Sequence, residues 1–353
     1  MAKDTIRLGI VGMSPTNMAS TFVLLKDTPG LRYEIAGVCA RRQEVLDACM
    51  QQFGIPFGTL DYRELAECDD VDVVCVYTPD HLHADHCAAA IEAGKHVVCT
   101  KPMVTSLHDA RRLVELVREK GVKFLVGETM LFDRQFRTAR KFFDDGDLGE
   151  LIAVESHYVH DLRSVFEFTP WRLSVPQDFM YGGCVHSIAA IRAFAGDVDT
   201  VHANAIRGNL TEGYPLADNF FINVRFKSGV IGRVSGLYGI VHPPMPMMQI
   251  GIYASRGSLQ TEFTDNEPGQ VRVVFDKLTD KRPFVADIEP ETDLSAYGLG
   301  ASVIRYMTHF QDCLDNHLDP YPGVEDSAKS IAVASAAWES VETGGVVKAV
   351  NEF

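Results

Sequence analysis

The first third of the chain alternates between two periodicities, and this alternation constrains the fold more than any other feature. Runs of strand length, rich in β-branched residues, are separated by stretches with helical spacing. Such an alternation predicts βαβ units and a parallel sheet. The runs are almost continuously apolar, as expected where helices cover both faces of a sheet. The predicted strands are Ile6–Gly12, Tyr33–Cys39, Asp72–Thr78, His96–Thr100 and Lys123–Gly127.

Glycines and a capping pattern mark the predicted helices. Three helices are expected to end at Gly54, Gly94 and Gly121, because glycine readily takes the left-handed conformation of a helix C-terminus. Ser106 followed by Asp109 resembles a capping box with Asp in the Glu position. We expect the helix that starts there to run to about residue 120.

After about residue 127 the pattern changes to alternating segments with few helices between them. This predicts a largely antiparallel sheet. Those segments are IAVESHYVH, FFINVRF, GVIGRVSGLYG and QIGIYA, and helical patterns cover Phe136–Asp144, Ser302–Asn316 and Glu325–Thr343. The stretch HPPMPMM at 242–248 is expected to form an exposed loop.

The fold class is therefore expected to be α/β, with two domains. At 353 residues the chain exceeds what one hydrophobic core usually serves. Residues 1–128 are predicted to form an N-terminal Rossmann domain with a doubly wound parallel sheet. Residues 129–353 are predicted to form a C-terminal α+β domain with a large, mostly antiparallel open sheet.

Composition excludes several classes of partner. Lys and Arg total 33 against 48 Asp and Glu, and the resulting net charge of −15 repels nucleic acid and anionic membranes. Without a signal peptide or a long apolar run, a cytoplasmic protein is expected. The eight cysteines lack the CxxC spacing of zinc or redox sites, which favours reduced thiols.

A degenerate glycine motif, GIVGMSPTNMAS, follows the first predicted strand. Counted from Gly12, Ser14 and Asn17 stand at the second and third glycine positions of a dinucleotide fingerprint. Ser14 and Pro15 suit an N-cap and a first helical residue, so the amides of Thr16 and Asn17 are expected to face an anion. The alternative is an ordinary turn between a strand and a helix.

The end of the second strand bears on the choice of cofactor. Ala40, Arg41 and Arg42 stand where dinucleotide-binding proteins often carry an acidic residue for the ribose 2′-hydroxyl. Guanidinium groups match a 2′-phosphate, so the expected cofactor is NAD(P) with a lean toward NADP. NAD stays open, because both arginines could simply be solvated at a helix start.

The segment VVCVYTPDHLHADHCAAAIEAGKHVVCTKPM closely resembles the Gfo/Idh/MocA family, named after glucose-fructose oxidoreductase, inositol dehydrogenase and rhizopine catabolism. That family's pattern reads TPNxxHxxxAxxALxAGKHVxCEKP. The matching residues are Thr78, Pro79, His83, Ala93, Gly94, Lys95, His96, Cys99, Lys101 and Pro102. Asp80 replaces the usual Asn and Thr100 the usual Glu. The resemblance extends over nearly the whole chain.

The resemblance implies a dehydrogenase with its reaction centre at Lys101, beside the nicotinamide and the reacting hydroxyl. A solvent-facing lysine at a strand end is the alternative. The residues that the resemblance places near the cofactor are Thr78, Pro79, His83, Thr100, Lys101 and Glu128. It also implies that the second domain binds substrate and forms oligomers.

A second similar stretch, PWRLSVPQDFMYGGCVHSIAAIRAFAGDV, lies in the predicted C-terminal domain. Aligning His186 with the family histidine puts Gly182 where many members have an aspartate and Cys184 where they have a glycine. The resemblance makes His186 the partner of Lys101, as proton acceptor or as an orienting group. A buried histidine that caps the following helix is the alternative.

Three further residues are candidate substrate contacts. Trp171 and Arg172 match a Trp-Arg pair that the family often has, and an indole ring with a forked donor suits a sugar. His160 ends a strand directed toward the same region, although such a residue is just as often ordinary surface.

Two histidine clusters raise the question of a metal site. They are His81, His83 and His86, and His157, His160 and Asp161. Positions 157 and 160 of a strand face opposite sides, and the first cluster lies at a loop and helix start. No metal is therefore expected.

These features predict an enzyme that transfers a hydride between nicotinamide and a secondary hydroxyl of a sugar, a glycoside (possibly at C3) or a cyclitol. One alternative is a glycosidase that retains its NAD and works by oxidation and elimination. Another is a non-catalytic regulator that senses nucleotide or sugar, against which the presence of Lys101 and His186 argues. Homo-oligomers are expected through the second-domain sheet.

Overall fold

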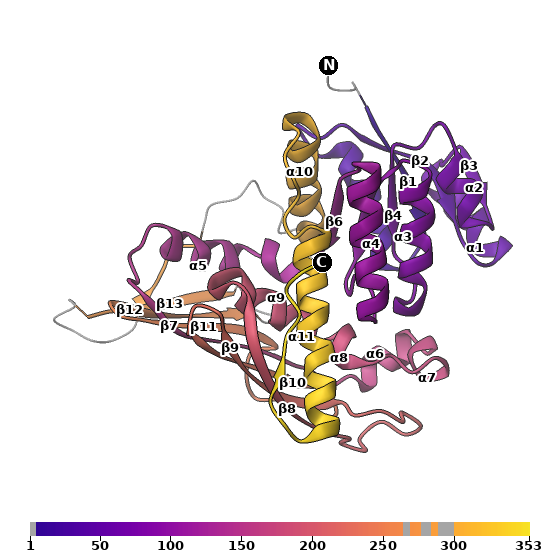
Figure 1. Cartoon of the computed structure of the whole chain (residues 1–353). Helices are drawn as coiled ribbons and strands as arrows, with labels where there is room; N and C mark the ends of the chain where they lie inside the picture. Colours follow the sequence, from indigo (N-terminus) through magenta and orange to yellow (C-terminus); the bar gives the residue numbers. More distant parts are fainter. Residues whose placement is uncertain (1–4, 264–268, 277–283, 289–299) are drawn as a thin grey trace. The chain divides into compact units, whose positions relative to one another are not determined.

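The computed structural model describes residues 5–263, 269–276, 284–288 and 300–353. The chain divides into two compact units. The first contains the described residues up to Thr129 together with residues 300–328 and Phe353, and the second contains the described residues from Met130 to 288 together with Lys329–Glu352. The first unit therefore takes in a C-terminal segment that the sequence boundary at 128/129 leaves in the second domain (Figure 1).

The first unit is built on a parallel sheet. Within the described residues this sheet has six strands in the order β3-β2-β1-β4-β5-β6, with every neighbouring pair parallel. The strands are β1 (Ile6–Val11), β2 (Tyr33–Cys39), β3 (Phe57–Thr59), β4 (Val73–Val76), β5 (His96–Thr100) and β6 (Phe124–Gly127). This is the strand order of a doubly wound Rossmann sheet, so the predicted fold of this part of the chain is confirmed.

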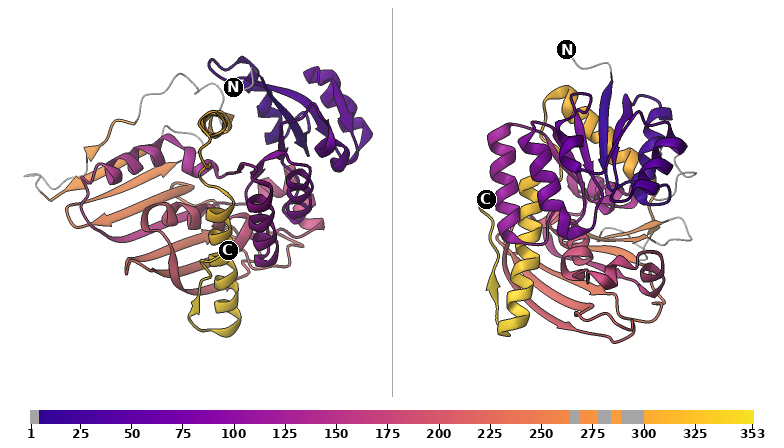
Figure 2. Two further views of the ribbon diagram at one scale, coloured as in Figure 1. Left: turned by 45° about the horizontal axis from the view of Figure 1, so that its top comes forward. Right: turned by 90° about the vertical axis from the view of Figure 1, so that its right-hand side faces the viewer.

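Helices flank the sheet on both sides (Figure 2), which explains why β1, β4 and β6 are almost entirely buried. The helices are η1 (Met18–Asp27), α1 (Gln43–Phe53), α2 (Tyr62–Glu67), η2 (Asp80–Leu82), α3 (His83–Glu92), α4 (Leu107–Lys120) and α10 (Gly300–Asn316). Gly54 and Gly121 are left-handed C-caps, and the Ser106 hydroxyl accepts a bond from the Asp109 amide. The predicted ends at Gly54 and Gly121 and the predicted cap are confirmed, whereas α3 ends at Glu92 with Ala93 as its C-cap, one residue before the predicted Gly94.

Two elements, β3 and α2, are not predicted from the sequence, because they are too short to show a hydrophobic periodicity. They nevertheless shape the sheet. A Cβ on Gly9 would lie 3.2 Å from Leu65 Cγ, and one on Gly37 would lie 2.7 Å from Leu65 Cδ1. The helix α2 therefore packs directly against the backbone of β1 and β2, because glycine stands at both contact points.

Helix α10 completes the first unit from the far end of the chain. The Tyr33 hydroxyl donates to the carbonyl of Met307 at 2.8 Å, and Arg32 pairs with Asp315 at 2.6 Å. Tyr306 hydrogen-bonds through its hydroxyl to Tyr77, the residue after β4. These contacts, all within the unit, account for the grouping of residues 300–328 with the Rossmann sheet.

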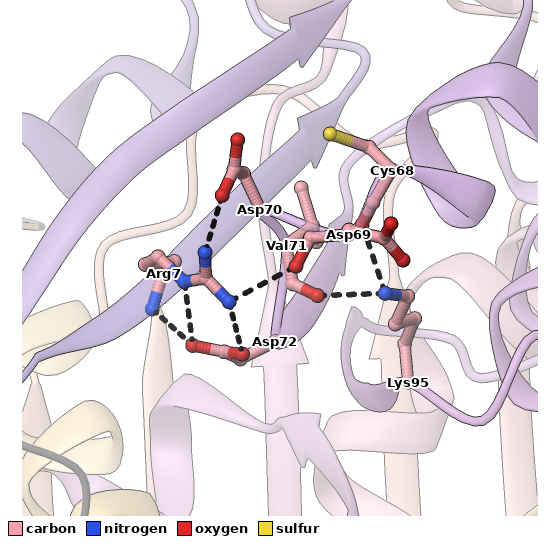
Figure 3. A network of polar contacts seen from close by, with 7 residues as sticks. All are labelled: Arg7, Cys68, Asp69, Asp70, Val71, Asp72 and Lys95. Carbon is pink, nitrogen blue, oxygen red and sulfur yellow. Dashed lines mark hydrogen bonds and ion pairs between the residues drawn. The ribbon is translucent and has the colours of Figure 1, made fainter.

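A polar network holds the loop between α2 and β4 (Figure 3). Arg7 donates to the carboxylates of Asp70 and Asp72, while Lys95 Nζ donates to the carbonyls of Cys68 and Val71 at 2.8 and 2.9 Å. Lys95 belongs to the family-like AGKH segment. In this structure its ammonium group binds backbone at the amino-terminal ends of the strands, so its part is structural.

The second unit is built on a mixed sheet that is mostly antiparallel, as predicted. Its order among the described residues is β14-β13-β12-β11-β7-β10-β9-β8-β15, and only the central pair β7–β10 is parallel. The strands are β7 (Leu151–Val159), β8 (Val198–Ile206), β9 (Asn219–Phe226), β10 (Ile231–Leu237), β11 (Met248–Ala254), β12 (Gly257–Phe263), β13 (Gln270–Phe275), β14 (Phe284–Val285) and β15 (Val347–Lys348).

Helices of the second unit pack on this sheet. Helix α5 (Arg134–Asp144) lies against β12 and β13, and α9 (Cys184–Ala195) lies against β7 and β10 (Figure 1). Trp338 of α11 (Val324–Thr343) contacts Phe220 of β9 with a ring separation of 5.6 Å. Three short helices precede α9: α6 (Arg163–Phe168), α7 (Trp171–Ser174) and α8 (Phe179–Gly182). The stretch 242–248 forms the predicted loop between β10 and β11, ending as β11 begins at Met248.

All eight cysteines are free thiols, in agreement with the prediction, and burial raises the pKa of Cys39 to about 12. No helix in the described ranges is long and apolar enough to cross a membrane.

Backbone segments of the first unit pack closely where β1 ends. The Gly12 amide donates to the Cys39 carbonyl at 2.9 Å, and a Cβ on Gly12 would lie 2.7 Å from the Tyr77 carbonyl oxygen and 2.8 Å from Thr78 Cγ2. Gly12 also has a φ of +90°, which L side chains rarely adopt. Only glycine fits at the point where β1, β2 and β4 converge.

We therefore expect Gly12→Ala to destabilise the protein much more than Gly30→Ala. Gly30 has a similar φ of +85° but open space where its Cβ would lie, so Gly30→Ala isolates the backbone penalty of about 1–2 kcal/mol. The collision at Gly12 adds about 1–3 kcal/mol. Urea unfolding followed by circular dichroism measures both. Equal losses for the two variants would show that the strand ends are not packed as described.

Candidate active site

The turn after β1 is closed by the side chain of Asn17. Its Oδ1 accepts from the Ser14 amide at 3.0 Å, and its Nδ2 donates to the Gly12 carbonyl at 2.7 Å. Helix η1 is a 3₁₀ helix that begins only at Met18, so the prediction of Ser14 as N-cap and Pro15 as first helical residue is wrong. The Asn17 side chain occupies backbone groups that a helix starting at Pro15 would use otherwise.

The predicted anion contacts in this turn stay predictions. The Asn17 amide donates within the turn to the Ser14 carbonyl at 3.4 Å, whereas no backbone bond of this kind involves the Thr16 amide in the described structure. The turn lies between the ends of β1 and β4, where the strand order reverses. Ligands of doubly wound sheets bind at this switch point.

The two arginines that are predicted to contact the cofactor follow the end of β2. Ala40 is buried and its amide donates to the Thr59 carbonyl at 3.3 Å. Arg41 and Arg42 are exposed, and Arg42 pairs with Glu44 at 3.3 Å at the start of α1. Among the described residues Arg41 forms no ion pair. The two guanidinium groups are therefore not equivalent.

His83 joins the ends of β4 and β5. Its Nε2 lies 2.7 Å from the Thr78 carbonyl and its Nδ1 lies 2.7 Å from the Pro102 carbonyl. The side chain is completely buried. The sequence analysis expects His83 beside the cofactor, but both ring nitrogens contact protein backbone. His83 therefore positions the Lys101–Pro102 segment, whose peptide bond is cis.

The Thr78 side chain has a partner that the sequence analysis considers only as a metal ligand. Thr78 Oγ1 lies 3.0 Å from His86 Nδ1, and the His86 ring lies 4.2 Å from the ring of Tyr62. Burial lowers the pKa of His86 to about 4, so the ring is neutral near pH 7. The spacing of His83 and His86, one helical turn apart, is the signal that could have linked both rings to one residue, Thr78.

Adjacent parallel strands bring the other predicted cofactor residues to the same edge of the sheet. Thr78 and Pro79 follow β4, Lys101 follows β5, and Glu128 follows β6. Thr100 pairs in register with Gly127, so β5 and β6 end level. Glu128 is buried, and its amide donates to the Val126 carbonyl at 2.8 Å. The carboxyl edge of the first unit therefore carries Lys101 and the Gly12 turn.

In the second unit, Tyr158 lies between two predicted site residues. Its ring lies 6.0 Å from that of His186 at an interplanar angle of 67°, and 6.1 Å from that of His160 at 17°. His186 is buried in the first turn of α9. Tyr158 is not among the predicted site residues, although it stands two positions before His160, which directly follows β7, and alternate residues of a strand share a face. His157 instead contacts the Pro246 carbonyl at 2.9 Å.

Trp171 and Arg172 also lie together, on α7. The Arg172 guanidinium carbon lies 4.4 Å from the centre of the Trp171 ring, and Arg172 Nε donates to Gln177 Oε1 at 2.6 Å. Gln177 is buried, and the sequence analysis does not single it out. A flat ring covered by an oriented guanidinium offers both an apolar face and forked donors.

The two glycines before α9 are explained by their neighbours. A Cβ on Gly182 would lie 2.6 Å from Gln177 Nε2, and a Cβ on Gly183 would collide with the Tyr238 ring. Tyr238 is fully buried beside Cys184. A side chain at position 183 would therefore meet a buried ring, whereas one at position 182 would have to displace the Gln177 side chain.

One cavity of about 530 Å³ lies elsewhere in the first unit. Its lining includes Arg7, Tyr33, Glu34 and Asp70, which are near the amino-terminal ends of the strands. It is therefore at the opposite edge from Gly12 and Lys101. The described residues contain no cluster of three His, Cys, Asp or Glu side chains that could hold a metal ion.

Comparison with known proteins gives matches over nearly the whole chain. Residues 6–128 match the Gfo/Idh/MocA oxidoreductase family with an NAD-binding Rossmann fold, and residues 140–349 match that family's C-terminal alpha/beta domain. Levoglucosan dehydrogenase of Pseudarthrobacter phenanthrenivorans is 24% identical over 267 residues, 68% of either protein. The 1,5-anhydro-D-fructose reductase of Ensifer adhaerens is 27% identical over 348 residues, 96% of this chain and 97% of the relative.

A solved structure of levoglucosan dehydrogenase in complex with NADH and L-sorbose shares the fold. It superposes with a TM-score of 0.85 at 19% identity and covers 99% of this chain and 100% of the other. The two domain matches, which span most of the sequence, settle the family. The chain belongs to the Gfo/Idh/MocA oxidoreductases, with the NAD-binding Rossmann fold and the C-terminal α/β domain of that family.

Proposed function

We propose that this protein transfers a hydride between a nicotinamide cofactor and a secondary hydroxyl of a sugar, glycoside or cyclitol. The observation that carries this proposal is the carboxyl edge of the first sheet. There the Gly12 backbone stands at the switch point, and His83 holds the segment of Lys101 at a neighbouring strand end. The names of the relatives, levoglucosan dehydrogenase and 1,5-anhydro-D-fructose reductase, support a sugar-like substrate.

The first unit fits a dinucleotide at this edge. Gly12 leaves bare backbone at the point where a Cβ would fill the gap between strand ends. The turn to Asn17 would take the pyrophosphate, the segment after β2 the adenosine ribose, and Thr78, Pro79 and Thr100 the nicotinamide side. When bound, the nicotinamide supplies C4 as the hydride donor or acceptor.

Lys101 and His186 are the proposed catalytic residues. Oxidation of the alcohol removes a hydride from carbon and a proton from oxygen. We assign the proton to His186 and the placement of the oxygen to the Lys101 ammonium group. Trp171 would bind the apolar face of the sugar ring, and Arg172 would bind further hydroxyls. His160, which lies beside Tyr158, is the third proposed substrate contact. Gly182 supplies no carboxylate, so these two groups carry the acid–base chemistry alone.

Replacing Lys101 by Ala is expected to lower kcat by about 10²- to 10⁴-fold, because a positioned proton-transfer group contributes on that order. The Kd for the cofactor should stay within about threefold of the wild-type value, because the variant leaves the turn from Gly12 to Asn17 unchanged. NAD(P)H absorbance across a panel of pyranoses, glycosides and cyclitols measures turnover, and NADH fluorescence measures binding. Lys348→Ala, at an exposed position of β15, is the control.

The outcomes separate the candidate functions. A fully active Lys101→Ala variant would mean that the reaction centre lies elsewhere. Hydrolysis of glycosides without added cofactor would identify a glycosidase that retains its nucleotide. A wild-type protein that binds cofactor and converts nothing in the panel would favour the regulator.

We further propose that Arg41 reads the 2′ position of the cofactor, giving a preference for NADP. Arg41 is exposed at the end of β2, whereas Arg42 is engaged with Glu44. Arg41→Ala should lower kcat/KM with NADP about tenfold, equivalent to about 1.4 kcal/mol, and leave NAD nearly unchanged. Arg42→Ala should have a smaller effect. If Arg41→Ala weakens both cofactors equally, the arginine does not contact a 2′-phosphate.

The exposed sheet face of the second unit is the proposed surface for homo-oligomers. Phe221, Ile231 and Tyr253 lie on neighbouring parts of this sheet and are 50%, 59% and 43% exposed. Burial of such residues between copies would stabilise an assembly. Light scattering should give a mass above that of one chain, and Ile231→Arg should lower it. A monomeric wild-type protein would contradict the proposal.

A further inference from the structure

We propose that Gln177 is a positioning residue that determines substrate specificity, by orienting Arg172 and by occupying the space next to Gly182. This inference rests on the proposed function of the same site. It concerns a residue that is not among the predicted site residues, brought to the site by the fold of the segment between α7 and α8.

The main chain of Gln177 is held from two directions. Its amide donates to the Arg172 carbonyl at 3.2 Å, and its carbonyl accepts from the Tyr214 hydroxyl at 2.5 Å. The Tyr214 ring is itself packed against Phe166 and Phe179, at 5.6 and 5.5 Å. Gln177 as a whole is only 6% exposed. The two hydrogen bonds and this burial fix the backbone from which the carboxamide side chain extends.

The carboxamide orients the guanidinium group. Gln177 Oε1 accepts from Arg172 Nε at 2.6 Å, and the guanidinium lies over the Trp171 ring. Because a guanidinium is planar, a bond to Nε and a stacking surface together define the directions of its terminal nitrogens. Loss of the carboxamide would remove the bond to Nε and so loosen the orientation of these nitrogens.

The same carboxamide determines what residue 182 can be. Gln177 Nε2, Cδ and Cγ all lie within 3.0 Å of the place where a Cβ at Gly182 would be. Gly182 ends α8, one turn before His186 in α9. A neutral amide that carries no titratable proton therefore occupies the space where a side chain from position 182 would begin.

Three consequences follow for the reaction. Gln177 cannot take up or release the alcohol proton, so its effect is on placement. Its removal should weaken sugar binding through Arg172. Converting it to a carboxylate should introduce an ionising group that the native site lacks.

The experiment compares Gln177→Leu and Gln177→Glu with wild type. Gln177→Leu should raise KM for the best sugar of the panel about tenfold or more, with a smaller change in kcat and an unchanged Kd for NADH. Gln177→Glu retains an oxygen for Arg172, so KM should stay within about threefold of wild type, while the pH profile of kcat/KM gains an ionisation. Gln52→Leu, at an exposed position of α1, is the control.

A second arm tests the geometry without substrate. Gly182→Ala should destabilise the wild-type protein but cost less in a Gln177→Ala background, because the colliding side chain is then shorter. Additive losses in urea unfolding would overturn the placement of the carboxamide beside Gly182.

The two arms separate the proposals. A wild-type protein that converts no substrate in the panel would count against the proposed function. An active wild type with wild-type KM and kcat in Gln177→Leu would overturn the role of Gln177 alone.

Discussion

The arrangement of the first unit depends on one steric constraint, the convergence of three strand ends around Gly12. The register places Val11 of β1 beside Cys39 of β2 and Val76 of β4, so all three strands end level. The space left is filled by backbone, with the Tyr77 carbonyl where a side chain would start. A doubly wound sheet reverses its strand order at this point, and the same packing that closes the core exposes backbone at its carboxyl edge.

Side chains that bind backbone then define the segments around this edge. Asn17 closes the turn after β1, and His83 ties the segment after β4 to the one after β5. In the second unit, hydrogen bonds to Arg172 and Tyr214 fix the main chain of Gln177, and its side chain in turn orients the Arg172 guanidinium. The segment of Lys101 and the side chain of Arg172 are thus held by polar groups with defined partners. Leaving such groups unsatisfied costs more than making them gains, which is why they order a site.

The long elements of both units could be predicted from the sequence, because their periodicity extends over many residues. The apolar runs of β1, β2 and β4 and the helix that Ser106 caps are examples. The predicted start of the first helix is wrong, because the Asn17 side chain binds backbone groups that the residue pattern assigns to a helix. Elements as short as β3 and α2 show no hydrophobic periodicity, so they could not be predicted in this way. The membership of α10 in the first unit depends on contacts such as Tyr33 with Met307, far apart in the chain.

The sequence by itself determined which chemical groups are available: Lys101 after a strand, a glycine at the end of the first strand, His186 just before a predicted helix, and the Trp171–Arg172 pair. It also determined the family, because these residues occur in long recognisable segments. Only the tertiary structure decided their partners. His83 turned out to bind two carbonyls, Tyr158 to separate two histidines, and Gln177 to exclude a side chain at 182. The physical reason is that hydrogen bonds and steric exclusion act over a few ångströms in space, and the order of residues along the chain does not contain those distances.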